Sequence, residues 1–324
     1  MSEKYFQISV CIFSRNPRQE EFIKVANALE NQTLDKILWE LVIIDNKSDI
    51  PLRQQFRDLF LWHPYVRFVL EPNYGFPYCH KRVFIESKAE LILIIADDNI
   101  LHANYLSNAV SIMKAQPSIG VLTGLVNFHS PAGISKFSKK LHDHIYNDGG
   151  FTGFIKSKEM KKYTPALRGS AGMILRKAVG LKYLEVFPIY ELLMMKLKEN
   201  GINNLRGTDL DIPMLAMKHG YFVARSSEII MEHHASKEEI EVVKILKSYY
   251  LMCFSEQLFK FRWGWTERPI VYLFFAKNFF KAIFNIYQIL NPLWVFGLCK
   301  NIAITRSNHF LKTNKIVAEK IKII

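Results

Sequence analysis

The chain has 324 residues, 49% of them apolar, and a formal net charge of +13 at pH 7, so it can build one sizeable core, or one domain with an appendage. Its four cysteines lie far apart and form no CxxC pair, which argues against a disulfide framework or a structural zinc site and favours a reducing compartment. The first residues, MSEKYFQISV, lack a basic stretch followed by a long apolar run, so we expect no signal peptide.

The first 130 residues alternate short apolar runs with amphipathic stretches. The pattern predicts strands at residues 8–13, 38–44, 66–70 and 91–95. It predicts helices at residues 17–29, 51–60 and 77–87, the first with Asn16 as N-cap and Pro17 at the first helical position. Strands and helices in this alternation indicate an α/β layered domain with a parallel sheet.

The rest of the chain changes character twice. Residues 130–170 have weak periodicity, and we expect long loops over a site there. A helix within residues 205–221 and a strand at 222–224 are predicted next, and near residue 240 the chain becomes basic and aromatic. We therefore expect a first domain at residues 1–240 and a helical region at residues 241–324.

Three polar peptides directly follow predicted strands, and they begin at Ser14, Asp45 and Asp97. Because ligands bind beyond the carboxyl ends of parallel strands, we expect these peptides to converge on one crevice. The first strand is not followed by GxGxxG, so the phosphate loop of a dinucleotide-binding domain is missing.

Asp97 and Asp98 are adjacent carboxylates that repel each other unless they share a cation. Mg²⁺ or Mn²⁺ would accept one or two carboxylates together with phosphate oxygens of a substrate. Such an ion would neutralise a diphosphate leaving group. The alternative is a solvated turn or a helix N-cap, which is the commoner role of an isolated Asp-Asp pair.

Two further acids have two interpretations each. Asp45 could accept a hydrogen bond from a nucleobase N–H or a ribose hydroxyl, or it could be an Asx-turn residue. Asp209 could remove the proton of an acceptor hydroxyl. Alternatively, Asp209 could be a helix N-cap, with Asp211 in the first turn favouring the helix dipole. The two roles of Asp209 are compatible.

His233 and His234 follow an apolar stretch. One of them could complete the shell of a metal ion or contact a pyrophosphate. In an extended backbone adjacent side chains point to opposite faces, so at most one is a natural ligand. Surface or packing histidines are the alternative.

The order of these peptides resembles the family 2 glycosyltransferases. The matching segments are residues 8–16, 42–49, 73–75, 96–99, 169–173, 207–211 and 233–236. Each segment is weakly specific, but their common order over about residues 7–240 is specific. Residues 248–262 also resemble the rhamnosyltransferase-like branch.

The resemblance implies a GT-A type nucleotide-diphospho-sugar transferase fold, with a mostly parallel central sheet flanked by helices, for the catalytic domain at residues 1–240. It implies a nucleoside-diphosphate-sugar donor, a divalent metal ion and inversion at the anomeric carbon. We expect the donor to be UDP- or dTDP-linked and the metal to be Mg²⁺ or Mn²⁺. Ser14 and Asp45 would contact the nucleoside, and Asp97 would lie by the ribose or the diphosphate. Asp98 would ligate the metal, with His233 or His234 as a further ligand, and Asp209 matches the acid that serves as base.

The sequence departs from the family pattern at two places. The family often has three acids in the metal motif, whereas the first is Ala96 and the last is Asn99 here. The usual Glu-Asp is Thr208-Asp209, so the base is kept but a neighbouring acid that could orient the acceptor is not.

Residues 240–324 contain 13 Lys and Arg, 4 Glu and no Asp, and 16 of the 48 residues from 249 to 296 are aromatic. The apolar run 271–299 is broken by polar residues such as Lys277 and Lys281, whereas a spanning helix prefers about 20 clean apolar residues. We therefore predict amphipathic helices that lie on an anionic membrane. The density of Phe, Ile and Leu argues against nucleic acid. The alternative is a helical subdomain packed on the core or in a homo-oligomer.

The leading hypothesis is an inverting hexosyl- or deoxyhexosyltransferase on the cytoplasmic face of the membrane, which builds a polysaccharide on a glycan or lipid-linked acceptor. A second hypothesis is a sugar-phosphate nucleotidyltransferase, but that enzyme should have a glycine-rich phosphate loop where residues 14–17 have no glycine. A third is a non-catalytic basic module that binds membrane or nucleic acid.

Overall fold

The computed structural model describes residues 5–146, 150–169, 171–202, 207–238, 240–265 and 292–322. The chain divides into two compact units. Unit 1 comprises Met1–Asn127, Asp148–Phe187 and Thr208–His234, and unit 2 comprises Phe128–Asn147, Pro188–Gly207 and Ala235–Ile324. The region predicted at residues 241–324 thus shares unit 2 with two earlier segments.

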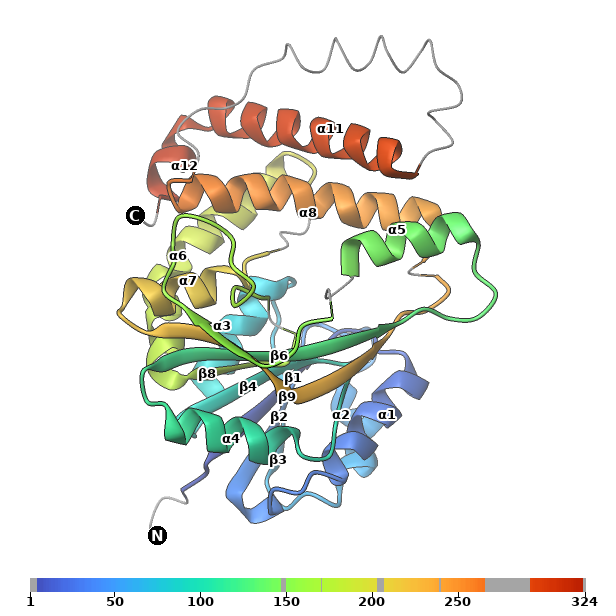
Figure 1. Ribbon diagram of the computed structural model, residues 1–324, viewed down its shortest axis with the longest axis vertical. Helices are drawn as coiled ribbons and strands as arrows, with labels where there is room; N and C mark the ends of the chain where they lie inside the picture. Colours follow the sequence, from blue (N-terminus) through green and yellow to red (C-terminus); the bar gives the residue numbers. More distant parts are fainter. Residues whose placement is uncertain are drawn as a thin grey trace. The chain divides into compact units, whose positions relative to one another are not determined.

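Unit 1 is built on a mixed sheet, which has nine strands within the described residues (Figure 1). The strand order is β3-β2-β1-β4-β8-β6-β9-β5, and β7 pairs with β9. The strands are β1 (Ile8–Ser14), β2 (Trp39–Asp45), β3 (Val66–Leu70), β4 (Leu91–Ala96), β5 (Asn99–Leu101), β6 (Ile119–His129), β7 (Phe154–Ser157), β8 (Met173–Arg176) and β9 (Phe222–His234).

The first four strands are parallel, as predicted, whereas β8 pairs antiparallel with β4 and β9 antiparallel with β5 and β7. In the parallel part Ser14 lies opposite Asp45, and Phe13 lies opposite Ala96. The carboxyl ends of β1, β2 and β4 therefore lie level with one another at one edge of the sheet.

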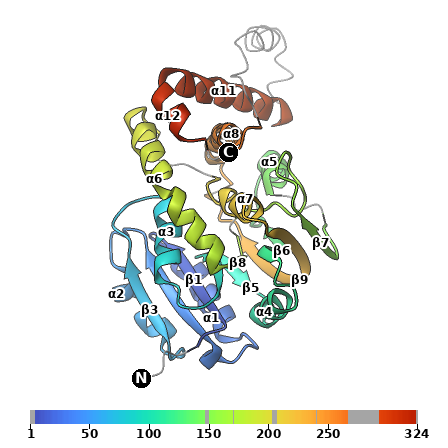
Figure 2. The same cartoon turned by 90° about the vertical axis from the view of Figure 1, so that its left-hand side faces the viewer.

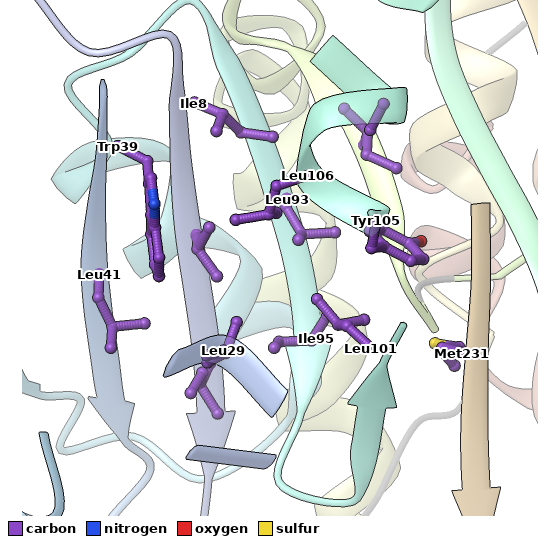
Figure 3. Packing of buried hydrophobic residues seen from close by; sticks show 14 of the residues in the cluster. Ile8, Leu29, Trp39, Leu41, Leu93, Ile95, Leu101, Tyr105, Leu106 and Met231 are labelled. Atoms are coloured by element: carbon purple, nitrogen blue, oxygen red, sulfur yellow. The ribbon is translucent and has the colours of Figure 1, made fainter. Parts of the chain in front are cut away.

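Helices cover both faces of the sheet (Figure 1). The helices are α1 (Gln19–Glu30), α2 (Leu52–Phe56), α3 (Phe76–Glu86), α4 (Tyr105–Ala115), the first part of α6 (Lys177–Glu199) and α7 (Asp211–Lys218). Figure 3 shows Leu29 of α1 and Leu106 of α4 packed against Leu93 and Ile95 of β4. On the opposite face, Phe13 of β1 meets residues of α3. Alternate strand residues are buried on each face, which is why β1, β2 and β4 are apolar almost throughout.

Unit 2 is helical. It contains α5 (Lys136–Tyr146), the end of α6, α8 (Val242–Arg262), α11 (Pro292–Thr313) and α12 (Lys315–Lys320). Figures 1 and 2 both show α11 alongside α8, and the rings of Tyr249 and Phe296 lie 4.2 Å apart between these helices. Among the described helices, none combines the length and the apolar composition that crossing a membrane requires.

The structure differs from the predicted local structure in two segments, and a third prediction lies mostly outside the described residues. Residues 130–170, predicted as loops, contain α5 and β7. The strand predicted at 222–224 is the beginning of a 13-residue strand, β9. Most of the amphipathic run predicted at 271–299 lies outside the described residues, which resume with α11.

Candidate functional site

Ser14 and Asp97 meet at the carboxyl edge of the sheet. The Ser14 hydroxyl donates a short hydrogen bond to Asp97 Oδ2. Burial and the negative charge of Asp98 raise the pKa of Asp97 from 3.8 to about 6, although the Ser14 hydrogen bond acts in the opposite sense. Asp97 is thus a carboxyl group that can change its charge close to neutral pH.

Asp98 is held from two sides. Its Oδ1 accepts a hydrogen bond of 2.9 Å from the Asn99 amide, whose own oxygen accepts one of 3.0 Å from the Ala96 N–H. Asn99 therefore closes the turn after β4. On the other side, His233 Nε2 lies 3.2 Å from Asp98 Oδ2.

The Asp98–His233 pair leaves the carboxylate ionised. Burial alone would raise the pKa of Asp98, but the hydrogen bond and charge of His233 and the charge of Arg18 together lower it below its ordinary value. Only 17% of the Asp98 side chain and 21% of the His233 side chain are exposed. Across the described part of the chain, no three His, Cys, Asp or Glu side chains are grouped so that they could hold a metal ion.

His233 and His234 differ in orientation because β9 is extended there. His233 lies opposite Asn99 in the antiparallel pair with β5, which brings its ring to Asp98. The backbone of His234 also contacts the site: its carbonyl oxygen accepts a 3.4 Å hydrogen bond from Arg18 Nη2.

Asp45 lies at the end of β2, buried to 95%, and both of its carboxylate oxygens are hydrogen-bonded within its own loop. Oδ1 accepts from the Ser48 N–H at 2.8 Å, and Oδ2 accepts from the Leu52 N–H at 2.9 Å. The carboxylate thus stabilises the loop that follows β2, which is a structural role like the one considered as the alternative for Asp45, although its bonds reach further along the chain than those of an Asx turn. Each oxygen keeps a lone pair that a ligand could use.

The connections after β1 and β2 are tied together by side chains. Asn16 has a φ of 51°, and its amide exchanges hydrogen bonds of 3.0 and 2.9 Å with Asp49. The prediction that Asn16 caps the following helix is therefore wrong, because its side chain is bonded to the neighbouring loop. Arg18 occupies the N-cap of α1, and its side chain makes no capping hydrogen bond.

Asp209 precedes α7, whose N-cap is Leu210. The structure thus does not support the interpretation of Asp209 as that cap. Its carboxylate packs against Gly169, since a Cβ atom at Gly169 would lie 2.3 Å from Asp209 Oδ2. Only glycine leaves room for the carboxylate in this position.

His80 lies against the end of β1, and its pKa is influenced by the charge of Asp209. Its ring is fully buried and lies 5.8 Å from the ring of Phe13, the residue before Ser14, and 5.8 Å from that of Tyr183. Burial lowers the pKa of His80 from 6.5 to about 4, although the negative charge of Asp209 raises it in part. The imidazole is therefore neutral at pH 7, beside the predicted base.

Sequence reasoning missed Arg18 and His80. Arg18 was detectable as a basic residue in the connection after the first predicted strand. His80 precedes Phe84 by four residues on the apolar side of a predicted helix, a spacing that signals burial.

Solved structures of other proteins share this architecture, whereas comparisons of the sequence found no match. The sequence matches no protein-family model and no curated protein. A structure of GalNAc-T7 with UDP, GalNAc and Mn²⁺ superimposes with a TM-score of 0.51 and 12% identity, covering 79% of this chain and 51% of that chain. A structure of the mannosyltransferase PcManGT from Pyrobaculum calidifontis with GDP-Man and Mn²⁺ superimposes with a TM-score of 0.50 and 12% identity, covering 97% of this chain and 76% of that one.

The chain thus spans about half the length of the GalNAc-T7 chain. At this level of identity the likeness concerns the fold. The chain has the GT-A fold expected from the resemblance. Its central sheet is flanked by helices but is mixed rather than mostly parallel, because β8 pairs antiparallel with β4 and β6, and β9 pairs antiparallel with β5 and β7.

Proposed function

We propose that the chain transfers a sugar from a nucleoside-diphosphate-sugar to a hydroxyl acceptor, with the help of a divalent metal ion and with inversion at the anomeric carbon. The observation that carries this proposal is the meeting of Ser14, Asp97, Asp98 and His233 at the carboxyl edge of a GT-A sheet. Ligands of α/β sheets bind at this edge.

The residues present fit a divalent metal. One carboxylate oxygen and one imidazole nitrogen, 3.2 Å apart, are ligands that Mn²⁺ accepts, whereas Mg²⁺ prefers oxygen alone. We propose that Asp98 and His233 hold the ion, and that diphosphate oxygens and water complete its shell. His234 is less suited because adjacent side chains of a strand point apart. A bound ion would neutralise the diphosphate and fix its orientation. GalNAc-T7 and PcManGT were both observed with Mn²⁺.

We propose that Ser14, Asp45 and Asp97 bind the nucleoside side of the donor. Asp45 and Ser14 lie opposite each other at the ends of adjacent strands. Asp97 is bonded to Ser14 and so faces the same edge. The donor nucleotide would be UDP or dTDP, and GDP belongs in any test because PcManGT was observed with GDP-Man.

Asp209 is the proposed base. As the acceptor oxygen bonds to the anomeric carbon, the bond from that carbon to the phosphate oxygen breaks and its electron pair stays on the diphosphate. The hydroxyl proton moves to the Asp209 carboxylate. Neutral His80 adds no positive charge that would weaken this base. Because Gly169 has no side chain, there is space for the Asp209 carboxylate beside it.

The amino-acid sequence supports a more specific proposal about family, pathway and location. We propose membership of the family 2 glycosyltransferases, with the rhamnosyltransferase-like branch as a candidate, and a role in surface polysaccharide synthesis on the cytoplasmic face of the membrane. The basic residues of unit 2 would contact anionic lipid.

Donor hydrolysis tests the reaction without knowledge of the acceptor. UDP-, dTDP- and GDP-linked sugars would be incubated with the chain and Mn²⁺, and sugar release would be followed by proton NMR. We expect slow release from one donor, with an inverted anomer as first product, and its loss in Asp98→Asn. Asp58→Ala, which removes an exposed carboxylate elsewhere in unit 1, is the matched control. Pyrophosphate formation from a nucleoside triphosphate and a sugar phosphate would instead identify a nucleotidyltransferase, and no turnover of either kind would favour a binding module.

A further inference from the structure

Arg18 brings a positive charge to the site from the connection after β1. Its backbone has φ −70° and ψ 120°, so it lies just outside α1. Its guanidinium donates the 3.4 Å hydrogen bond to the carbonyl oxygen of His234, next to His233. The side chain is half-buried. This contact fixes the guanidinium beside the end of β9, where the Asp98–His233 pair lies.

The charge of Arg18 acts on both carboxylates of the site. Burial is the largest influence on the pKa of Asp97 and of Asp98 and raises each, while Arg18 is among the groups that lower both. One guanidinium is thus close enough to Asp97 and to Asp98 for its charge to affect each of them. A group at that position would also face a diphosphate bound to an ion held by Asp98 and His233.

The negative charge of a bound diphosphate would be balanced better with a further cationic group beside the metal ion. A divalent ion offsets the two carboxylates, and each phosphate of the donor then brings a negative charge of its own. Breaking the bond to the anomeric carbon adds a further negative charge on the departing oxygen. A guanidinium presents several N–H donors in a rigid plane that matches phosphate oxygens. Fixed donors aimed at developing charge are worth more in a half-buried site than in water.

We propose that Arg18 binds the outer phosphate of the donor and stabilises the diphosphate as it leaves. This inference rests on the proposed function and adds a residue that the family resemblance did not supply. The electron pair of the broken bond remains on the diphosphate, and the acceptor proton still goes to Asp209, so Arg18 neither gains nor loses a proton.

The test compares nucleoside diphosphates with monophosphates. Calorimetry with Mn²⁺ would give the affinities of UDP, GDP and dTDP, and of UMP, GMP and dTMP, for the native chain, Arg18→Ala, Arg18→Gln and Arg18→Lys. For the tightest diphosphate we expect Arg18→Ala and Arg18→Gln to lose about ten- to a hundredfold in affinity, and Arg18→Lys to recover part of it. The matching monophosphate should change less than about threefold.

Arg15→Ala is the matched control. Arg15 stands in the same connection, but its Nε donates to the Lys47 carbonyl at 3.1 Å, and its guanidinium lies 4.7 Å from the ring of Tyr74. This variant removes the same charge and should leave the ratio of diphosphate to monophosphate affinity unchanged.

Mn²⁺ affinity without nucleotide separates this role from a structural one. Removing a cation beside two carboxylates should leave Mn²⁺ binding unchanged or make it tighter, whereas a collapsed site would bind Mn²⁺ more weakly. Equal losses for diphosphate and monophosphate, unchanged diphosphate affinity, or weakened Mn²⁺ binding in both Arg18→Ala and Arg18→Gln would overturn the inference while leaving the proposed function in place. Failure of the native chain to bind any of the three diphosphates would overturn both.

Discussion

His233 Nε2 lies 3.2 Å from Asp98 Oδ2, although the two residues come from distant parts of the chain. They meet because the short strand β5, directly after Asp98, pairs with the end of β9 so that Asn99 faces His233. The pairing of two strands thus places an imidazole beside the carboxylate that follows β4. The same edge holds Ser14, Asp97 and Arg18.

Gly169→Ala should impair the reaction through Asp209. The new methyl group would meet Asp209 Oδ2 at 2.3 Å, and the flexible carboxylate would move rather than the backbone. Because a displaced catalytic group can cost about a hundredfold in rate, we expect donor hydrolysis to fall by about that factor while UDP affinity and melting temperature change little. Gly297→Ala, where a Cβ atom meets nothing within 4 Å, should keep full activity. Equal activity of the two variants would argue against Asp209 as the base.

Asp97 should make the stability of the metal-free protein depend on pH. Its pKa is about 6 in the folded protein and has a reference value of 3.8, so the folded state binds the proton more tightly. The stabilisation that this proton gives is complete below pH 3.8 and is lost as the pH rises through about 6. Urea unfolding of the native chain and of Asp97→Asn at several pH values isolates this effect. A stability difference that stays constant from pH 4 to pH 7 would contradict it.

His63 and His80 should remain neutral far below the usual range. Burial lowers the pKa of each from 6.5 to about 4. As the pH falls, these histidines are therefore protonated in the unfolded chain before they are protonated in the folded one. The free energy of unfolding should decrease progressively between pH 6.5 and about pH 4. Proton NMR titration of the ring resonances reports each pKa directly. Titration of His80 near 6.5 would show that its ring is solvated.

Unit 2 should bind anionic membranes through its exposed lysines. Lys312, Lys315 and Lys320 are exposed on α11 and α12. Since each basic residue near an anionic surface contributes about 1 kcal/mol, replacing all three by Glu should weaken co-sedimentation with phosphatidylglycerol vesicles by about a hundredfold or more. The control replaces Lys24, Lys114 and Lys218, which are exposed in unit 1. Equal binding by both triple variants would argue against this surface.

The parallel half of the sheet could be predicted because its signal is local. Continuous apolar runs predicted β1 to β4 within one residue at each end, and the polar peptides after β1 and β4 contain Ser14 and Asp97, whose side chains meet. Of the antiparallel half, only the beginning of β9 was predicted. β8 has only four residues, and its place between β4 and β6 depends on pairing between distant segments.

The same limit applies to individual side chains. Asn16 has the local features of a helix cap, yet its amide bonds to Asp49, which lies 33 residues away. Arg18 could be linked to the site only when the position of β9 was known, because the contact is with the carbonyl oxygen of His234. His233 could be distinguished from His234 only when the register of β9 with β5 was known.

The most direct test of the proposed metal and donor site is the Mn²⁺ dependence of UDP, dTDP and GDP binding, measured by calorimetry with Mn²⁺ or with EDTA. For one of these nucleotides, the account predicts an affinity at least about tenfold higher with Mn²⁺. That gain should be lost in Asp98→Ala, reduced in His233→Ala and retained in Asp58→Ala. An affinity that is the same with Mn²⁺ and with EDTA, or a gain that survives in Asp98→Ala, would contradict it.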